Sequence, residues 1–168
     1  VVRSRGLGDV YKRQVFKRDR SGDDESGFWA GDGNGTFSFN YPLVWVDPEE
    51  SERTAPQQVY LEGLIDDLGY ALAAPDFTSP ATGLHYSEII DVDAFIDHHI
   101  LNILFKNPDA FRLSGYMHKD RGGLIVAGPM WDLDRTAGGN DLRCLDPFLW
   151  DATNLTSDTT PAFTWGWY

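Results

Sequence analysis

The segment Asn107-Pro108-Asp109, together with Gly128-Pro129-Met130-Trp131-Asp132-Leu133-Asp134 further along the chain, gives the strongest indication of the fold. The first segment follows a helical pattern of apolar residues, and the second follows two β-rich stretches that predict a hairpin. Because a hairpin reverses the chain, it can bring together the residues on either side of it. We therefore expect Asp109 and Asp132 to lie at one site.

The predicted helix before Asp109 has the clearest periodicity in the chain. Asp91 is a residue type that favours the N-cap, and Asn107-Pro108 should stop the helix because proline cannot continue it. The apolar face predicted from this spacing contains Phe95, Ile96, His99, Ile100, Ile103 and Leu104. After this helix, the two strands of the hairpin are predicted over residues 113–118 and 124–127, around a Gly-containing turn.

The N-terminal half predicts two short strands and a second helix. Strands are expected over residues 15–18 and 36–41, separated by an acidic, Gly-rich loop. Asp47 and Pro48 then resemble an N-cap and a first helical residue, so one helix, or two with a break, should span roughly 49–73. Together with the hairpin, these elements predict the α+β class.

The first 14 residues differ from the rest of the chain. They contain four of the 14 basic residues, and the string RGLGDVYKRQ resembles a translated sequencing adapter. We expect residues 1–14 to be a non-native artefact and exclude them from the fold prediction. Residues 15–168 are then expected to be a partial domain that is truncated at both ends.

The composition excludes several classes of function. A net charge of −12 repels a nucleic-acid backbone but favours cations and basic substrates. The chain has no apolar run near the ~20 residues that cross a bilayer, so no membrane span is predicted. Its single cysteine, Cys144, excludes an intramolecular disulfide.

The acidic residues admit ordinary structural explanations as well as chemical ones. Asp109 follows a proline and suits a turn. Asp132 and Asp134 project to the same side of an extended segment, where they repel each other unless a cation lies between them. Alternatively, Asp134 pairs with Arg135 or caps a following turn.

The order of helix, loop Asp, hairpin and second Asp is that of the kinase C-lobe. There the loop Asp orients the acceptor hydroxyl, and the Asp after the hairpin binds Mg²⁺. Four stretches together resemble the CotH family, the spore coat protein H type of kinase-like proteins: residues 91–97 (DVDAFID), 107–110 (NPDA), 114–120 (SGYMHKD) and 128–134 (GPMWDLD).

This resemblance implies an atypical protein-kinase-like fold that uses ATP with Mg²⁺ or Mn²⁺ to phosphorylate protein Ser or Thr. It makes Asp109 the catalytic residue and Asp132 a metal ligand, with Asp134 as a secondary ligand. Ser114 stands where kinases place a metal-binding Asn, so it is a further candidate ligand. ATP-contacting residues are not identified, and Lys17 is expected to be structural.

The resemblance also sets expectations for the whole protein. The fragment should be mainly the C-lobe half and inactive alone, because the phosphate-contacting lobe would precede Val15. The parent protein should be secreted, displayed on the cell surface or part of a bacterial spore coat, and should act on a Ser-rich, basic protein. Two alternatives remain open: an inactive kinase-like binding module, and a glycosidase that uses Asp109 and Asp132 as acid and base.

Overall fold

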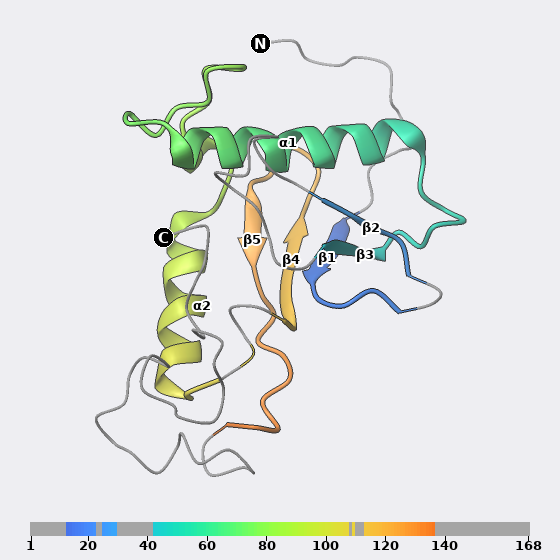
Figure 1. The fold of residues 1–168 in the computed structure, drawn as a ribbon, viewed down its shortest axis with the longest axis vertical. Helices are drawn as coiled ribbons and strands as arrows, with labels where there is room; N and C mark the ends of the chain where they lie inside the picture. The colour runs from blue at the N-terminus through green and yellow to red at the C-terminus, as the bar shows by residue number, and fades with distance from the viewer. Residues whose placement is uncertain (1–12, 23–24, 30–41, 108, 110–112, 137–168) are drawn as a thin grey trace.

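The computed structural model describes residues 13–22, 25–29, 42–107, 109 and 113–136. In this part of the chain, a small sheet is combined with two α-helices (Figure 1). Helix α1 lies across one end of the strands, and helix α2 runs beside β5. The α+β prediction is therefore confirmed. The strand predicted over residues 36–41 and the residue Cys144 lie outside the described residues.

The sheet joins the N-terminal strands to the hairpin. Its strands pair antiparallel in the order β2-β3-β1-β4-β5. They are β1 (Gln14–Arg18), β2 (Gly27–Phe28), β3 (Leu43–Asp47), β4 (Gly115–Lys119) and β5 (Ile125–Ala127). Because β1 is central, the two halves of the described chain form one sheet.

Strand β1 has the alternation that its sequence predicts. Phe16 is fully buried and lies opposite Trp45 of β3 and Met117 of β4. The strand begins one residue before the predicted Val15, since Gln14 pairs with Lys119. The buried face of this central strand forms part of the hydrophobic core.

The core lies between this sheet and α1 (Ala55–Ala73). Leu61, Ile65 and Leu68 are fully buried at helical spacing along α1. The predicted start of this helix at residue 49 is wrong, because Asp47 ends β3 and Thr54 precedes the helix. The Gln57 carboxamide accepts hydrogen bonds from the backbone N–H (2.8 Å) and the hydroxyl (3.0 Å) of Thr54.

Helix α2 (Val92–Leu104) starts where the sequence predicts. The Asp91 carboxylate accepts a hydrogen bond of 3.1 Å from the backbone N–H of Ala94. The helix ends before Asn107, because Lys106 takes a left-handed φ of 51° that helical residues cannot adopt. The single-turn 3-10 helix η1 (Tyr86–Glu88) precedes α2.

The apolar face predicted for α2 is only partly buried in the described structure. Phe95, His99 and Ile103 are half-buried, whereas Ile96, Ile100 and Leu104 are about half exposed. Among the described residues of this helix, the one that is fully buried is the polar Asn102, with 1% exposure. Neither described helix is long and apolar enough to cross a membrane.

The hairpin prediction is confirmed, with the first strand beginning at Gly115. Met117 pairs with Ala127, and Lys119 pairs with Ile125. The Ile125 carbonyl accepts a 2.8 Å hydrogen bond from the backbone N–H of Asp91. This bond holds β5 against the start of α2 and thereby fixes where the chain leaves the hairpin toward Asp132.

Candidate functional site

Asp109 is buried, with 8% exposure, between α2 and the hairpin. Its backbone N–H donates to the side-chain oxygen of Asn107 at 3.2 Å, and its carbonyl accepts from the N–H of Leu113 at 2.7 Å. The side chain that supports this turn is therefore that of Asn107, in the manner of an Asx-turn. These hydrogen bonds involve the backbone of Asp109 and not its carboxylate.

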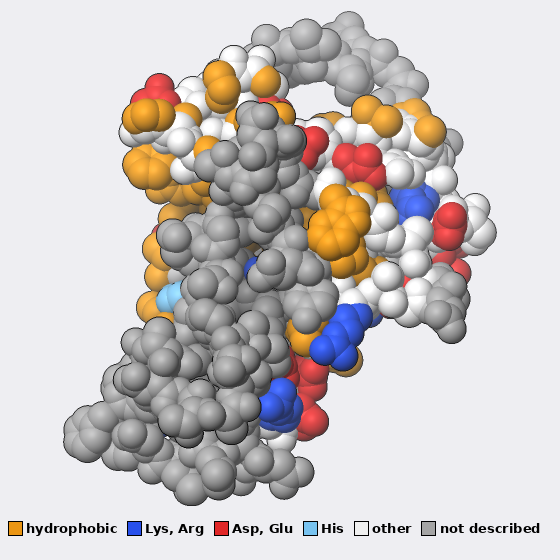
Figure 2. Space-filling model, in the orientation of Figure 1, with side chains coloured by type: hydrophobic (Ala, Val, Ile, Leu, Met, Phe, Trp, Pro, Cys, Tyr) orange, Lys and Arg blue, Asp and Glu red, His pale blue; other side chains and the backbone are white. Residues whose placement is uncertain are grey.

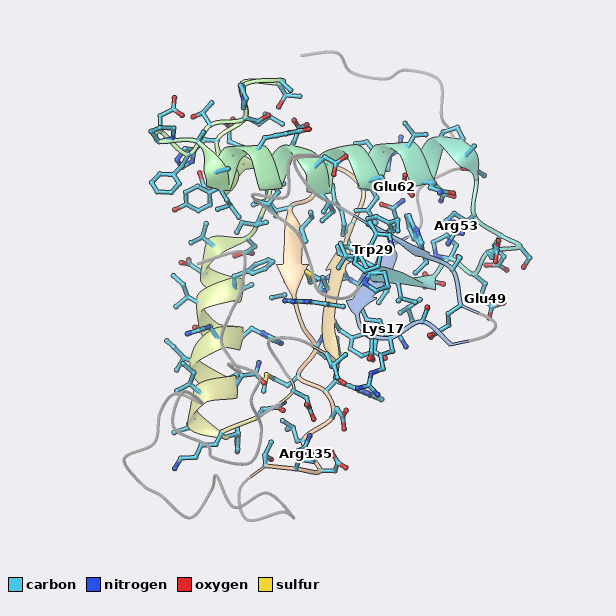
Figure 3. All side chains as sticks on the ribbon, viewed as in Figure 1. Lys17, Trp29, Glu49, Arg53, Glu62 and Arg135 are labelled. Carbon is cyan, nitrogen blue, oxygen red and sulfur yellow. The ribbon has the colours of Figure 1, made fainter. Side chains whose placement is uncertain are left out.

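The Asp109 carboxylate is paired with Arg135. The guanidinium Nη1 lies 2.7 Å from Asp109 Oδ2, and the Asp109 side chain is only 12% exposed. Arg135 follows closely after Asp132, so this ion pair joins the two segments that the sequence predicts to converge. In Figure 3, Arg135 lies on the segment after β5, and Figure 2 shows acidic side chains next to a basic one at the lower edge of the described surface.

Ser114 and Asp132 meet at the open end of the hairpin. The Ser114 hydroxyl donates to Asp132 Oδ2 at 2.8 Å. Both residues have left-handed backbones, with φ values of 55° and 57°. The other two described non-glycine residues with positive φ are Phe77 and Lys106, which follows α2. Such conformations carry strain and cluster at functional sites.

The carboxyl groups of Asp132 and Asp134 interact directly. The pKa of Asp134 is raised mainly by its hydrogen bond with Asp132, and also by desolvation and by the Asp132 charge. Backbone N–H groups of Asp134 and Arg135 act in the opposite direction. Carboxylates that interact in this way favour either a shared proton or a cation between them.

The oxygen atoms at this site are of the kind that Mg²⁺ and Mn²⁺ prefer. In the described part of the chain, no three His, Cys, Asp or Glu side chains gather into a metal-binding group. Two carboxylates and a hydroxyl nevertheless suit Mg²⁺, which uses one or two protein carboxylates and takes its other ligands from phosphate and water. Asp132, Asp134 and Ser114 therefore fit such an ion.

An exposed aromatic side chain stands beside these oxygen ligands. Trp131 is 57% exposed, and its ring lies 5.5 Å from that of Tyr116 on β4. An exposed large aromatic next to a polar site provides a surface on which a planar or apolar group can pack. The sequence places Trp131 directly before Asp132, but it does not indicate that the Trp131 side chain is exposed.

Lys17 belongs to a separate cluster on the N-terminal strands. Its ammonium lies 2.7 Å from Glu25 Oε1 and 4.0 Å from Asp19. Desolvation opposes the charged ammonium, but the hydrogen bond and charge of Glu25 outweigh it and raise the pKa of Lys17. The hydrogen bond from Lys17, followed by that from the Gly22 N–H, lowers the pKa of Glu25. This ion pair agrees with a structural role.

A cleft of about 450 Å³ adjoins the Lys17 cluster and includes Glu25, Trp45, Glu49 and Glu50 in its lining. Figure 3 shows Lys17 and Glu49 well separated from Arg135. None of the predicted site residues lines this cleft. The four predicted site residues therefore lie outside this cleft.

Sequence reasoning missed three contributors to the site. Arg135 was considered as a partner for the adjacent Asp134, but its guanidinium reaches Asp109. Asn102 and Asn107 form a side-chain hydrogen bond of 3.2 Å behind Asp109. The Asn107-Pro108-Asp109 motif could have indicated an Asx-turn, whereas no signal in the sequence marks Asn102 as buried.

These features define an α+β protein in which a helix, Asp109, a hairpin and Asp132 follow one another along the chain, in the order of the kinase C-lobe. The chain belongs to the CotH kinase protein family, whose model matches residues 12–163. The match includes all four predicted site residues and supports a kinase-related function and an association with the spore coat or surface. Searches of curated proteins and of solved structures found no match.

Proposed function

We propose that this chain is part of a CotH-type protein kinase that transfers the γ-phosphoryl group of ATP to protein Ser or Thr with Mg²⁺ or Mn²⁺. The observation that carries the proposal is the hydrogen bond of 2.8 Å between the Ser114 hydroxyl and Asp132 Oδ2 at the end of the hairpin. The raised pKa of the nearby Asp134 supports it. Family membership supports the same reaction class.

Asp132 and Asp134, with Ser114, would hold the divalent ion. When bound, such an ion supplies positive charge against the phosphate oxygens of the nucleotide. Asp109 orients the acceptor hydroxyl and accepts its proton. Arg135 binds Asp109 Oδ2 at 2.7 Å and so fixes the plane in which that carboxylate faces the acceptor.

The acceptor in this proposal is a Ser-rich, basic protein. The chain carries a net charge of −12, which attracts a cationic substrate and repels polyanions.

The proposal is tested in the complete protein with Asp132→Asn. Transfer of labelled phosphate from ATP to a Ser-rich basic protein should be lost, because the amide removes the charge that would bind the metal. Asp97→Asn is the matched control, since Asp97 is an exposed acid on α2. Circular dichroism checks that both variants fold. Robust transfer by Asp132→Asn would overturn the proposal.

The identity of residue 114 favours one alternative, a kinase-like binding module without catalysis. A Ser hydroxyl is a weaker metal ligand than the Asn carboxamide that kinases place here, and it already donates to Asp132. Titration of the complete protein with ATP and Mn²⁺ separates the two functions. A binding module should show no metal-dependent ATP binding.

A further inference from the structure

We infer that Asn102 and Asn107 are positioning residues for Asp109, an inference that rests on the proposed function because it gives Asp109 its catalytic role. The two carboxamides form a buried chain of hydrogen bonds from α2 to the backbone of Asp109. The family resemblance assigns neither asparagine a role in the reaction. Neither residue is among the four predicted site residues.

The chain starts at Asn102, which is 1% exposed. Its Nδ2 donates to the carbonyl of His98 at 2.9 Å, one turn earlier in the same helix. Its Oδ1 accepts from Nδ2 of Asn107 at 3.2 Å, and its backbone carbonyl accepts from the Asn107 N–H at 2.9 Å. Asn102 therefore ties Asn107 to the helix through both side chain and backbone.

Asn107 passes this constraint on to Asp109. It is 3% exposed, and its Oδ1 accepts from the Asp109 N–H at 3.2 Å. Lys106, in its left-handed conformation, turns the chain back so that Asn107 reaches the end of α2. The Nδ2 of Asn107 thus binds the helix, and its Oδ1 binds the backbone of Asp109.

The residue type supports positioning rather than simple packing. A buried position in a helix is normally apolar, since an amide must recover in hydrogen bonds what it loses in hydration. In α2 the apolar Ile96, Ile100 and Leu104 are exposed while Asn102 is buried. A directional hydrogen bond, which an apolar side chain cannot supply, accounts for the buried carboxamide of Asn102.

The consequence for the reaction is specific. Hydrogen bonds fix the N–H and the carbonyl of Asp109, while Arg135 fixes its carboxylate. Small displacements of a catalytic group slow the chemical step without weakening ground-state binding. Loss of either asparagine should therefore lower kcat and leave KM for ATP and for the acceptor protein nearly unchanged.

The test uses Asn102→Leu and Asn107→Leu in the complete protein, with two measurements. Each variant should lower kcat by roughly 10–100-fold with KM changed by less than about twofold. Hydrogen exchange of the Asp109 amide, measured by NMR, should accelerate by about tenfold or more. Asn107→Ser retains an oxygen that can accept from the Asp109 N–H, so it should recover part of both losses.

Gln57→Ala is the matched stability control, because Gln57 is a buried amide (5% exposed) at the start of α1. It should lower stability without changing kcat or the exchange of the Asp109 amide. If a leucine variant does not fold, Asn107→Ser against wild type decides: slower turnover and faster exchange support the inference, and unchanged values overturn it.

Three other results would overturn the inference: wild-type exchange of the Asp109 amide in the leucine variants, a rise in KM with kcat unchanged, or an equal loss of kcat in Gln57→Ala. If the wild-type protein transfers no phosphate, the proposed function fails separately. Exchange of the Asp109 amide then decides whether the two asparagines hold this turn.

Discussion

Ser114 and Asp132 face each other across the open end of the β4–β5 hairpin, with 2.8 Å between the Ser114 hydroxyl and Asp132 Oδ2. Both residues hold left-handed backbones, a conformation that costs roughly 1–2 kcal/mol for a residue other than glycine. The hairpin pairing and their hydrogen bond hold them there. Serine rarely adopts this conformation, so its hydrogen bond with Asp132, rather than the preference of the residue itself, holds Ser114 in place.

Replacing Ser114 by Asn tests this arrangement. Asparagine tolerates the left-handed region better than serine, and its carboxamide oxygen is a stronger ligand for a hard cation. We expect Ser114→Asn to bind Mn²⁺ several-fold more tightly in isothermal titration calorimetry with no loss of thermal stability. Ser114→Ala, which lacks any ligand oxygen, should bind less tightly than wild type. Equal affinities for all three proteins would exclude residue 114 from the site.

Gly128 controls the exit from β5 toward Asp132. Its φ of 119° lies in a region that is essentially restricted to glycine, although a Cβ there would meet no atom within 4 Å. Gly128→Ala should lower the free energy of unfolding by roughly 1–3 kcal/mol in urea titrations. Gly123→Ala is the control, since its Cβ would make only ordinary contacts from 3.5 Å. Equal effects would show that backbone strain at residue 128 is unimportant.

The local signals in the sequence located most of the fold. The hairpin, strand β1 and the start of α2 follow from alternation, turn residues and the Asp91 cap. The start of α1 was predicted wrongly because Asp47-Pro48 and Thr54-Ala55-Pro56 both look like helix starts. Pairing with β1 decides between them, since Asp47 lies opposite Val15 and is therefore part of a strand.

One contact between candidate residues follows from the order of elements. Ser114 and Asp132 were candidates before the structure, and the hairpin brings them into contact. Arg135 was not recognised as the partner of Asp109 because the sequence places it next to Asp134. Asn102 was missed because helical periodicity identifies apolar faces, and a buried amide is the exception to that rule.

The Arg135–Asp109 ion pair should matter more than a comparable pair on the surface. Removing the guanidinium leaves a carboxylate that is 12% exposed, so Arg135→Ala should lower the free energy of unfolding by roughly 1–2 kcal/mol. Phosphate transfer should also slow, because the carboxylate loses its orientation. The Arg13–Asp120 pair, with side chains 58% and 55% exposed, is the control, and Arg13→Ala should change chemical denaturation little. Matching effects of the two substitutions would contradict the importance assigned to burial.

The stability of α2 should depend on pH through His98. Burial, and then the charge of His99, lowers the pKa of His98 below its ordinary value of 6.5. The unfolded chain therefore binds more protons than the folded one between the lowered pKa and 6.5, so stability rises with pH in that window and is lost as pH falls. Protonation of His98 would also break the contact of 3.2 Å between its ring Nδ1 and Nδ2 of Asn102, because a protonated nitrogen cannot accept a hydrogen bond.

Urea titrations of wild-type protein should therefore give a lower free energy of unfolding at pH 5 than at pH 7. His98→Gln should weaken this dependence, because glutamine does not titrate in the range. Adding His99→Gln should weaken it further, since burial also lowers the pKa of His99. If His98→Gln and wild type lose the same free energy between pH 7 and pH 5, burial of His98 does not control the pH response, and the contact between His98 and Asn102 has no part in it.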